Sequence, residues 1–317
     1  MSSAYNTVMN IRQLRYFLAV AQELNFTRAA EKVGIAQPPL SQQILSLEQD
    51  LRTQLFIREK RNVRLTPAGE VLVDYAHRVI NAAAAAEAAV HMVERGARAN
   101  LRVGAIYSAV YSFLPAVLRD FSVRVPNAEI NLTEMTIAQQ IAGLNEGVIE
   151  VGLLRGPIHQ RDIHTEILYR ERLTVAIPAS MADEFGDSIS ISEIVNRPLI
   201  AVARGPQRGY SDRVLDVFDS HELEPNIAHE VSDMHTAVCL VAAGLGVSIV
   251  PGIIELMQTN GVVYRPLKEE TVGITFALAT RKDAESPLLD HFIDAARKQA
   301  QLMLPLYPHI FMKRVAH

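Results

Sequence analysis

Polar side chains able to hydrogen-bond to the edges of DNA bases line one face of a short stretch of the chain. Over residues 38–51, helical spacing gives one apolar face: Leu40, Ile44, Leu47 and Leu51. The opposite face carries Ser41, Gln42, Gln43, Ser46 and Gln49. Gln and Ser both donate and accept hydrogen bonds at base edges, whereas a face exposed only to solvent more often carries Lys and Glu. The pattern predicts a recognition helix.

Basic side chains flank this segment in the sequence. Arg28 precedes it, and Arg58, Lys60 and Arg61 follow it. Cationic groups in such positions contact DNA phosphates, which sets the affinity of a complex without carrying sequence information. We therefore expect these residues to hold the recognition helix against a nucleic acid.

The helices around this segment are predicted from apolar spacing and capping residues. Apolar residues recur with helical spacing over 11–24, and a short helix is predicted over 27–33 with Thr27 as its N-cap. Gly34 begins a turn that leads to Pro38, and proline is tolerated in a first helical turn. This order of elements predicts a helix-turn-helix.

A hairpin and a long helix follow. The runs 55–58 and 62–65 indicate two short strands. Thr66 is placed as the N-cap of a helix predicted over 67–96, with proline at its first position. Two series of mostly apolar residues repeat every seven positions and predict a coiled-coil seam. They are Leu72, Val79, Ala86 and Val93, and, between them, Tyr75, Ala82 and Ala89. Such a seam predicts that the helix pairs with a second helix. The alternative is that the helix packs on its own domain.

From residue 100 onward, short β-rich runs alternate with helical stretches. The predicted strands are 101–106, 129–134, 148–154, 173–177, 199–203, 247–250 and 274–279. The predicted helices are 110–123, 138–145, 211–221, 233–243, 253–258 and 287–302. Such alternation indicates parallel sheets with helices on both faces. A body of about 200 residues fits two small α/β lobes better than one sheet.

Composition and charge limit the class of protein. The chain has 317 residues, 49% apolar and 21% charged, which excludes a disordered or collagen-like chain. Its net charge of −4, taken whole, argues mildly against a nucleic-acid binder. Residues 10–66, however, hold nine Lys or Arg against five acids (+4), and the remainder holds 22 against 30 (−8). A basic module on an acidic body indicates an anionic partner for the module alone, although chance fluctuation is the alternative.

Other sequence features exclude further classes. No apolar run reaches the roughly 18 residues of a membrane span, and no signal peptide is recognised. The single cysteine, Cys239, cannot form an internal disulfide, so we expect a reducing cytoplasm. Its place on an apolar helix face predicts a buried, inert thiol. The histidines show no metal-ligand spacing, and we expect no metal, no cofactor and no catalytic group.

These motifs together resemble the winged helix-turn-helix of LysR-type transcriptional regulators. The matching segments are 14–17, 26–31, 37–44, 47–48, 55–58 and 65–69. The resemblance covers the whole chain, since 144–147 with 151–152, and 240–247, are similar to the family's effector domain. Within the family the chain is most similar to regulators of aromatic-compound degradation that answer to muconate, benzoate and similar acids.

The resemblance implies a fold and an assembly. A winged helix-turn-helix over 9–66 binds DNA, and a linker helix over 67–96 forms a homodimer, with dimers pairing into a homotetramer. The effector domain, 100–309, is of the two-lobed periplasmic-binding-protein type with a small-molecule inducer in its cleft. We expect one lobe from 100–168 and 273–309, and the other from 169–272. Double-stranded promoter DNA is then the main partner, RNA polymerase is a further candidate, and a membrane is not.

By motif match the resemblance also assigns DNA contacts. Gln37, Pro38, Ser41 and Gln42 stand at base-reading positions, and phosphates are contacted by Thr27, Arg28 and Arg58, with Arg61 beside them. The position after Ser41 is often arginine in the family and is Gln42 here. A contact favouring adenine would replace the bidentate arginine–guanine contact, so we expect the operator to differ there.

Ligands in α/β folds bind at the carboxyl ends of strands, where free N–H groups at helix starts favour anions. Residues at such junctions that match the family's inducer site are Ser108, Thr136, Arg155, Arg204, Gly205 and Tyr210. Thr136 stands one place earlier than the family's usual hydroxyl, which puts carboxylate capture at that helix in doubt and allows a more apolar or larger ligand. Each residue has a plainer alternative: a helix cap for Ser108 and Thr136, ion pairs for the arginines, and packing for Tyr210.

Two other classes of protein compete with an inducer-responsive regulator. An α/β enzyme with an appended DNA-binding module is one, but no nucleophile motif, P-loop or paired metal motif is found. A solute-binding protein is the other, and the basic module and the lack of a signal peptide oppose it. The sequence therefore predicts a cytoplasmic regulator without catalytic activity.

Overall fold

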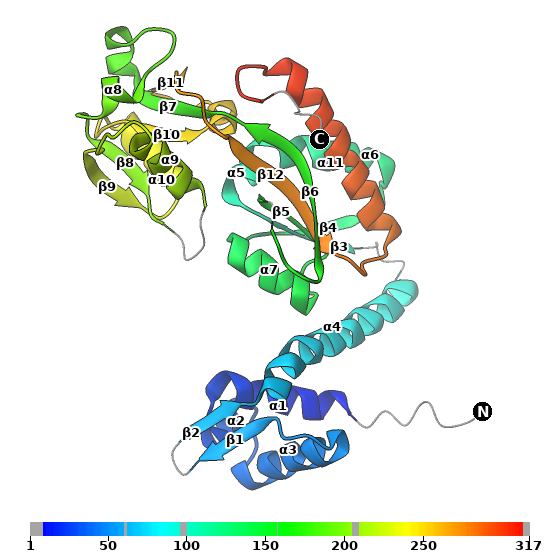
Figure 1. The fold of residues 1–317 in the computed structure, drawn as a ribbon. Coiled ribbons are helices and arrows are strands. Elements are labelled where there is room, and N and C mark those ends of the chain that lie inside the picture. Colours follow the sequence, from blue (N-terminus) through cyan, green and yellow to red (C-terminus); the bar gives the residue numbers. More distant parts are fainter. Residues whose placement is uncertain (1–8, 60–61, 96–99, 157, 205–208, 313–317) are drawn as a thin grey trace. The chain divides into compact units, whose positions relative to one another are not determined.

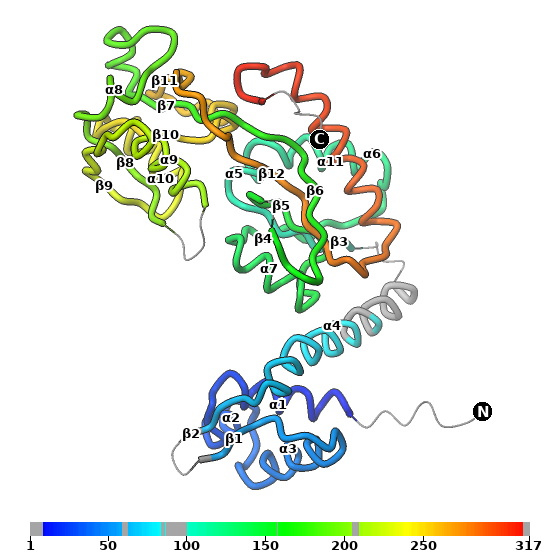
Figure 2. The backbone as a smooth tube through the Cα atoms, in the orientation of Figure 1, coloured from blue at the N-terminus to red at the C-terminus, as the bar shows by residue number. Residues whose placement is uncertain are grey.

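The computed structural model describes residues 9–59, 62–95, 100–156, 158–204 and 209–312. The chain forms two compact units. One comprises Met1–Ala99 with Ala142–Val148, and the other Asn100–Ile141 with Ile149–His317. Figure 1 labels the helices and strands of each unit, and Figure 2 follows the path of the backbone through them.

Three helices, a hairpin and a long helix make up the first unit (Figure 1). They are α1 (Ile11–Glu23), α2 (Phe26–Lys32), α3 (Gln37–Leu51), β1 (Phe56–Glu59), β2 (Asn62–Leu65) and α4 (Pro67–Arg95). The two strands pair antiparallel, with Phe56 opposite Leu65. The predicted helix-turn-helix, hairpin and long helix are confirmed within a few residues at their ends.

Capping side chains set where α2 and α4 begin. The Asn25 side chain accepts hydrogen bonds from the N–H groups of Thr27 at 2.9 Å and Arg28 at 3.1 Å. The predicted N-cap at Thr27 is therefore wrong, because Asn25 satisfies two free N–H groups and the helix starts before Thr27. The predicted cap at Thr66 is confirmed, since its hydroxyl accepts from the Gly69 N–H at 3.0 Å.

The apolar face of α3 forms part of the core of the first unit. Leu40, Ile44 and Leu47 are completely buried against α1 and α2. The Phe56 ring of the hairpin packs against Phe17 at 5.4 Å and Phe26 at 5.9 Å, measured between ring centroids. These contacts fix α3 so that its polar face points away from the core.

The start of α4 divides into a packed face and an exposed face. Leu72, Val73, Ala76 and Ile80 pack against the core of the first unit. An apolar row on the other side is exposed, and its members are Val71, Tyr75, Val79, Ala82 and Ala86. Leu72 thus belongs to the packed face and not to the predicted seam. The side chains of Ala89 and Val93, also placed in that seam, lie outside the described residues.

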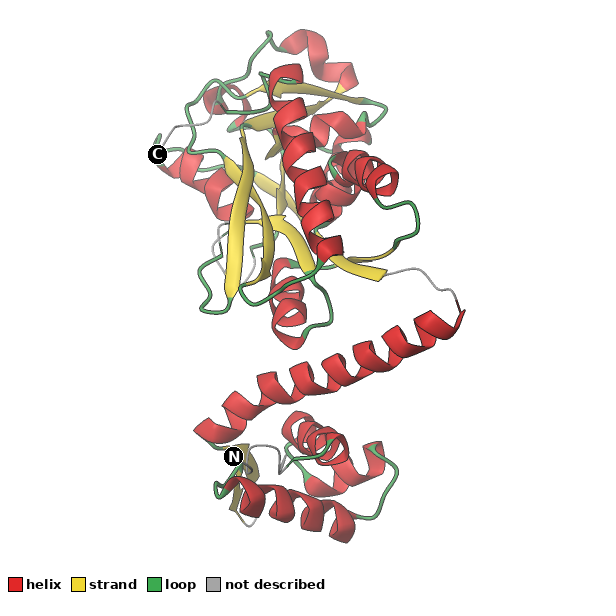
Figure 3. Cartoon of the chain, turned by 90° about the vertical axis from the view of Figure 1, so that its right-hand side faces the viewer, coloured by secondary structure: helices red, strands yellow, loops and turns green. Residues whose placement is uncertain are grey.

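The second unit contains a five-stranded sheet in the order β4-β3-β5-β12-β6. Figure 3 shows the strands of this unit in yellow and its helices in red. Its strands are β3 (Asn100–Ala105), β4 (Glu129–Glu134), β5 (Val151–Arg155), β6 (Ile163–Glu171) and β12 (Ile274–Arg281). The strand β3 runs parallel to β4 and β5, whereas β12 is antiparallel to β5 and β6. Helices α6 (Leu114–Arg124) and α11 (Pro287–Leu306) share the core on one face. On the other face, Gly104 lies against Gln140 of α7 (Ile137–Glu146).

A second group of five strands in this unit is arranged like the strands of the five-stranded sheet. Its strands are β7 (Leu173–Pro178), β8 (Leu199–Val202), β9 (Ile227–Val231), β10 (Ser248–Pro251) and β11 (Val262–Pro266). The strands β10 and β11 flank β7 antiparallel, and β8 pairs parallel with β9. A parallel bridge between Leu199 and Val247 places β8 beside β10. The order is therefore β9-β8-β10-β7-β11, which parallels that of the first sheet.

Short helices complete the second unit. They are α5 (Tyr107–Ser112), α8 (Ile191–Ile194), α9 (Tyr210–Asp219), α10 (Met234–Ala242), η1 (Ala179–Glu184) and η2 (Gly252–Met257). The helices α9 and α10 pack their buried residues on the second sheet. Among the described helices, none combines the length and the hydropathy needed to cross a bilayer.

The sequence predicts the parallel strands better than the others. Parallel sheets were expected, and this is wrong for β6, β7, β11 and β12, which pair antiparallel with their neighbours. The strands β6, β9 and β11 are not predicted at all. The side chains of β9 and β11 are exposed or half-buried, and β6 mixes such side chains with buried ones, so all three lack the continuous apolar run of a buried strand.

The chain passes between the two sheets at two places, after β6 and before β12. A C-terminal segment, residues 307–312, is hydrogen-bonded at the first of them. The Arg172 N–H donates to the Ile310 carbonyl at 2.7 Å, and the Met312 N–H donates to the Arg170 carbonyl at 2.9 Å. Gly273, just before β12, lies against the Met312 side chain. The C-terminal segment thus contacts both connections.

Candidate nucleic-acid interface and effector site

The polar face of α3 is presented to solvent at its N-terminal end. Gln37, Pro38 and Gln42 are exposed, and Ser41 is half-buried. The Gln37 amide donates to the Ser41 hydroxyl at 2.8 Å, so these two predicted base-reading side chains are already oriented together. Because Ser and Gln offer both donors and acceptors, this end of α3 is suited to hydrogen bonding in a major groove.

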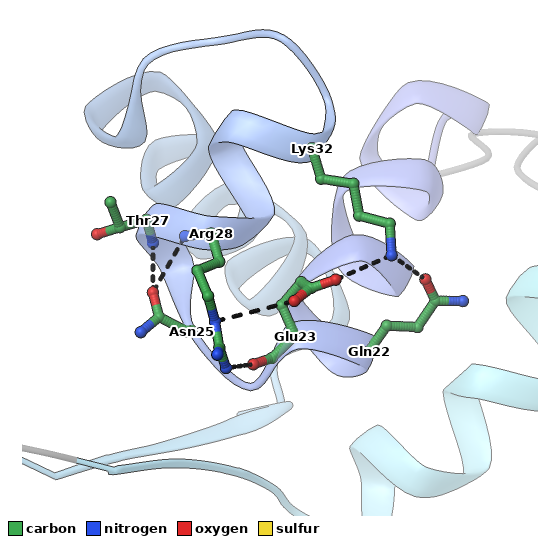
Figure 4. A network of polar contacts seen from close by, with 6 residues as sticks. All are labelled: Gln22, Glu23, Asn25, Thr27, Arg28 and Lys32. Atoms are coloured by element: carbon green, nitrogen blue, oxygen red, sulfur yellow. Dashed lines mark hydrogen bonds and ion pairs between the residues drawn. The ribbon is translucent and has the colours of Figure 1, made fainter.

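Thr27 and Arg28 lie at the start of α2, where both are exposed (Figure 4). The Arg28 guanidinium donates to the Glu23 carbonyl at 2.7 Å, and its Nε lies 3.8 Å from the Glu23 carboxylate. Lys32, one turn further along α2, is 2.9 Å from the other oxygen of that carboxylate. The side chains of Arg28 and Lys32 remain 64% and 50% exposed.

Arg58 is held more firmly than Arg28. Its Nη2 donates to Glu48 Oε2 at 2.7 Å, and its guanidinium lies 5.0 Å from the Phe26 ring centroid. The other Glu48 oxygen accepts from the N–H groups of Leu55 at 2.9 Å and Phe56 at 3.1 Å. Glu48 therefore joins α3 to the hairpin. Lys60 and Arg61, which are also predicted to contact phosphates, lie outside the described residues.

In the second unit, the structure brings Ser108 and Arg155 together. Arg155 Nη2 donates to the Ser108 hydroxyl at 3.1 Å, and Nη1 is 2.5 Å from Glu171 Oε1. The other Glu171 oxygen accepts from the Ile253 N–H at 2.9 Å. The Arg155 side chain is only 9% exposed, and that of Glu171 is completely buried. Among the described residues, Arg155 Nε has no hydrogen-bond acceptor, so a buried donor is available to a ligand.

Tyr210 is buried at the start of α9, where its hydroxyl donates to the Ile249 carbonyl. Burial raises the pKa of this hydroxyl well above its usual value, with Arg155 lowering it and Glu171 raising it. The phenol is therefore neutral, and its donor is already engaged. Tyr210 therefore has the packing role that was the alternative to inducer binding. Its hydroxyl nevertheless lies close enough to Arg155 for the charge of that arginine to affect its pKa.

The contacts of Thr136 and Arg204 are with residues other than Arg155. Thr136 is exposed and caps α7, because its hydroxyl accepts a hydrogen bond from the Gln139 N–H at 3.3 Å. In return, the Thr136 N–H donates to the Gln139 side-chain oxygen at 2.9 Å. Arg204 is 62% exposed and lies 3.8 Å from Asp212. Gly205 lies outside the described residues. The cap and ion-pair alternatives thus describe Thr136 and Arg204 as they stand.

Two family models match the chain at the positions of its two units. Residues 11–70 match the bacterial regulatory helix-turn-helix protein of the lysR family, and residues 94–301 match the LysR substrate binding domain. The chain belongs to the LysR family. It is a DNA-binding transcriptional regulator with an effector-binding domain, and its named relatives give no support to the enzyme alternative.

Similar proteins include a transcriptional activator, a regulator complexed with its target DNA and an effector-binding domain with benzoate. The regulator is 38% identical over 261 residues to a probable cat1 operon transcriptional activator of Acinetobacter lwoffii, covering 81% of this chain and 85% of that one. It is similar to full-length CbnR complexed with its target DNA, with TM-score 0.65, 30% identity and coverage of 92% and 100%. The BenM effector-binding domain with its effector benzoate gives TM-score 0.57, 26% identity and coverage of 69% and 97%.

Several residues beside Arg155 are not predicted from the sequence of the regulator. Glu171 is one, because it ends the unpredicted edge strand β6 and stands between two arginines, Arg170 and Arg172, in the sequence. Met234 Sδ lies 4.0 Å from Arg155 Nη2, at the start of α10. The next residue, His235, faces Tyr107 with 5.1 Å between ring centroids. Burial, followed by a hydrogen bond with Tyr111, raises the pKa of Tyr107 to about 12. No sequence motif signals this pairing of α5 with α10.

The prediction of a buried thiol at Cys239 is wrong. Cys239 is exposed on α10, and its Sγ lies 3.6 Å from Nε2 of His235, one turn earlier. Of its apolar neighbours in the sequence, Val238 is buried and Leu240 half-buried, but helical geometry turns Cys239 itself to the outside. In the described ranges, no group of three His, Cys, Asp or Glu side chains is placed to hold a metal ion.

Proposed function

We propose that the regulator responds to an aromatic or dicarboxylic acid catabolite bound between the two lobes of its effector domain. The observation that carries this proposal is the Arg155 guanidinium, nine-tenths buried beside the Ser108 hydroxyl and with its Nε donor unused. A buried guanidinium is a strong recognition group for a carboxylate. The benzoate found with the BenM effector-binding domain belongs to the same chemical class.

The remaining predicted effector residues complete the proposed site. Thr136 and Tyr210 stand at helix starts, Arg204 follows β8, and Gly205 is the next residue in the sequence. Tyr210 supplies a neutral phenol near Arg155, and its electrostatic coupling to that arginine supports its inclusion. Thr136 and Arg204 are exposed in this structure, so their inclusion requires an inducer that draws them toward Arg155.

For DNA, the proposed roles separate base reading from phosphate contact. Gln37, Pro38, Ser41 and Gln42 read base edges, and the exposure of α3 at this end supports that role. Phosphates are contacted by Thr27, Arg28, Arg58 and Arg61. One Arg58 nitrogen is held by Glu48, and the side chain remains 33% exposed, which leaves donors for a phosphate.

The proposed domains are 9–66 for DNA binding, 67–96 for dimerisation and 100–309 for the effector. One lobe comprises 100–168 with 273–309, and the other 169–272. The exposed apolar row on α4, defined above by its five residues from Val71 to Ala86, supports dimerisation through this helix. We propose a cytoplasmic homotetramer that activates transcription with RNA polymerase. The cat1 operon relative, named as an activator, supports the direction of control.

A binding assay on the full chain tests the proposal. The chain is titrated against its own upstream region, with and without a panel of aromatic acids and dienoates. We expect site-specific, salt-sensitive binding whose footprint changes with one member of the panel, and loss of that response in Arg155→Met. A response that survives this substitution would contradict the proposed inducer site.

Substitutions on the first unit test the assignment of DNA contacts. Gln42→Ala should relax the preference at one operator position, because it removes a base-edge contact. Arg58→Ala should weaken binding to all sequences alike, because phosphate contacts carry no sequence information. Uniform loss in both variants would reject the role given to Gln42.

A further inference from the structure

The carboxylate of Glu23 lies between two exposed cations of α2 (Figure 4). Lys32 Nζ is 2.9 Å from Glu23 Oε1 and 3.2 Å from the Gln22 side-chain oxygen. Arg28 Nε is 3.8 Å from Glu23 Oε2. One carboxylate therefore serves as the anion for both basic side chains, one of which is a proposed phosphate contact.

Glu23 is poorly placed to stabilise its own helix. It is the last residue of α1, where the helix dipole places partial negative charge, and a carboxylate there is unfavourable. The hydrogen bond from Lys32 nevertheless lowers the pKa of Glu23 below its usual value, so the group is ionised at neutral pH. Its favourable interactions are thus with the cations of α2 and not with α1.

The two cations are spaced as a pair that can follow a DNA strand. Arg28 and Lys32 are four residues apart, so they share one face of α2 with about 6 Å between them along the helix axis. Both face solvent, with 64% and 50% of their side chains exposed. Exposed ion pairs are weak and exchange readily, so a phosphate can replace Glu23 as their partner.

We propose that Lys32 is a further phosphate contact of the regulator, and that Glu23 is a resident anion which DNA must displace from Arg28 and Lys32. The inference rests on the proposed DNA-binding surface, and it adds that Glu23 limits the affinity of this surface for DNA. Because Glu23 neutralises part of the positive charge of α2, it restrains binding to DNA of any sequence. Its removal should therefore strengthen non-specific binding more than it changes sequence preference.

The test measures the affinity of the full chain for a random-sequence duplex over a range of salt concentrations. We expect Glu23→Gln to bind about fivefold more tightly than wild type at low salt, with a steeper salt dependence. Lys32→Met should make the slope of log affinity against log salt shallower by about 0.9, the value for one lost phosphate contact. The double variant should lose the gain made by Glu23→Gln.

Two matched variants serve as controls. Asp74→Asn makes the same change in net charge on the exposed surface of α4. Lys268→Met removes a lysine that is 49% exposed and, like Lys32, lies 2.9 Å from a glutamate, but in the second unit. Far-UV circular dichroism checks that each variant is folded, and the Lys32→Met slope stands alone if Glu23→Gln does not fold.

The outcomes separate this inference from the proposed function. If the wild-type chain shows no salt-dependent DNA binding, the proposed DNA-binding surface fails. If the wild type binds but Glu23→Gln matches Asp74→Asn, Glu23 is not a resident anion. If Lys32→Met keeps the wild-type slope, Lys32 does not contact a phosphate. Either of the last two results overturns the inference while leaving the proposed function intact.

Discussion

Glu171 and Glu23 each end an element of secondary structure and each contact an arginine, but their surroundings differ. Glu171 is completely buried, and the Arg155 side chain beside it is 9% exposed. Glu23 is 27% exposed, and its partners Arg28 and Lys32 are at least half exposed. Water competes for the second set of contacts and not for the first. The comparison shows that the buried pair fixes positions, whereas the exposed group remains free to exchange partners.

The largest effect is expected from removal of the buried carboxylate. Glu171→Ala leaves the Arg155 charge without its anion and the Ile253 N–H without its acceptor. We expect the free energy of unfolding to fall by about 3 kcal/mol or more, measured by urea unfolding of the full chain. The double variant Arg155→Met with Glu171→Met should recover the part of the loss that comes from the unpaired Arg155 charge, because apolar residues of similar size need no ionic partner, while the Ile253 N–H stays without its acceptor. A loss no larger than that of an exposed pair would end the distinction drawn here.

Glu48 provides an intermediate case in the first unit. It is nearly buried and accepts from two backbone N–H groups as well as from Arg58. We expect Glu48→Ala to lower the free energy of unfolding by about 2 kcal/mol, because the N–H groups of Leu55 and Phe56 lose their acceptor. Glu48→Gln keeps one acceptor oxygen and should lose less. Equal losses in the two variants would show that the charge, and not the acceptor, matters.

Asn25 tests whether exposure alone makes a polar contact weak. It is exposed, but its partners are the free N–H groups at the start of α2. Asn25→Ala should cost about 1 kcal/mol in unfolding free energy, as N-cap losses usually do. Thr27→Ala, at the position that the sequence predicts as the cap, should cost less. The reverse order would restore Thr27 as the N-cap.

The smallest effect is expected at the exposed pair between Lys268 and Glu193. The hydrogen bond from Lys268, together with one from the Ser190 backbone, lowers the pKa of Glu193 below its usual value. Because the pKa of Glu193 is lower in the folded chain than in the unfolded chain, the pair stabilises the fold at pH values above the unfolded-state pKa. This stabilisation disappears as the pH falls through the folded-state pKa. Lys268→Met should therefore change the Tm only slightly at neutral pH and not at all in acid. A large acid-sensitive difference would contradict the contrast between buried and exposed pairs.

The sequence predicts the first unit more completely than the second. Its apolar spacing, prolines and capping residues are local signals, and they place α1 to α4 within a few residues. The exception, Thr27 in place of Asn25, arises because both residue types cap helices and only the structure shows which side chain reaches the N–H groups. In the second unit, β6, β9 and β11 are missed because they lack a continuous apolar run.

The candidate effector site shows the same limit more sharply. Ser108 and Arg155 follow from motif position, and the structure places them in contact. Glu171 is brought to Arg155 by the pairing of β5 and β6 with β12, whereas Met234 and His235 reach Arg155 and Tyr107 from α10, which packs on the second sheet. No local pattern encodes such contacts. Cys239 shows that an apolar sequence neighbourhood does not fix which way one side chain of a helix points.

The C-terminal segment has a practical consequence for measuring inducer response. Ile310 and Met312 are hydrogen-bonded to Arg172 and Arg170, and Met312 also lies against Gly273 before β12. The end of the described chain therefore lies at the joint between the two sheets. A fluorescent reporter introduced at Met312 would sense rearrangement of that joint directly.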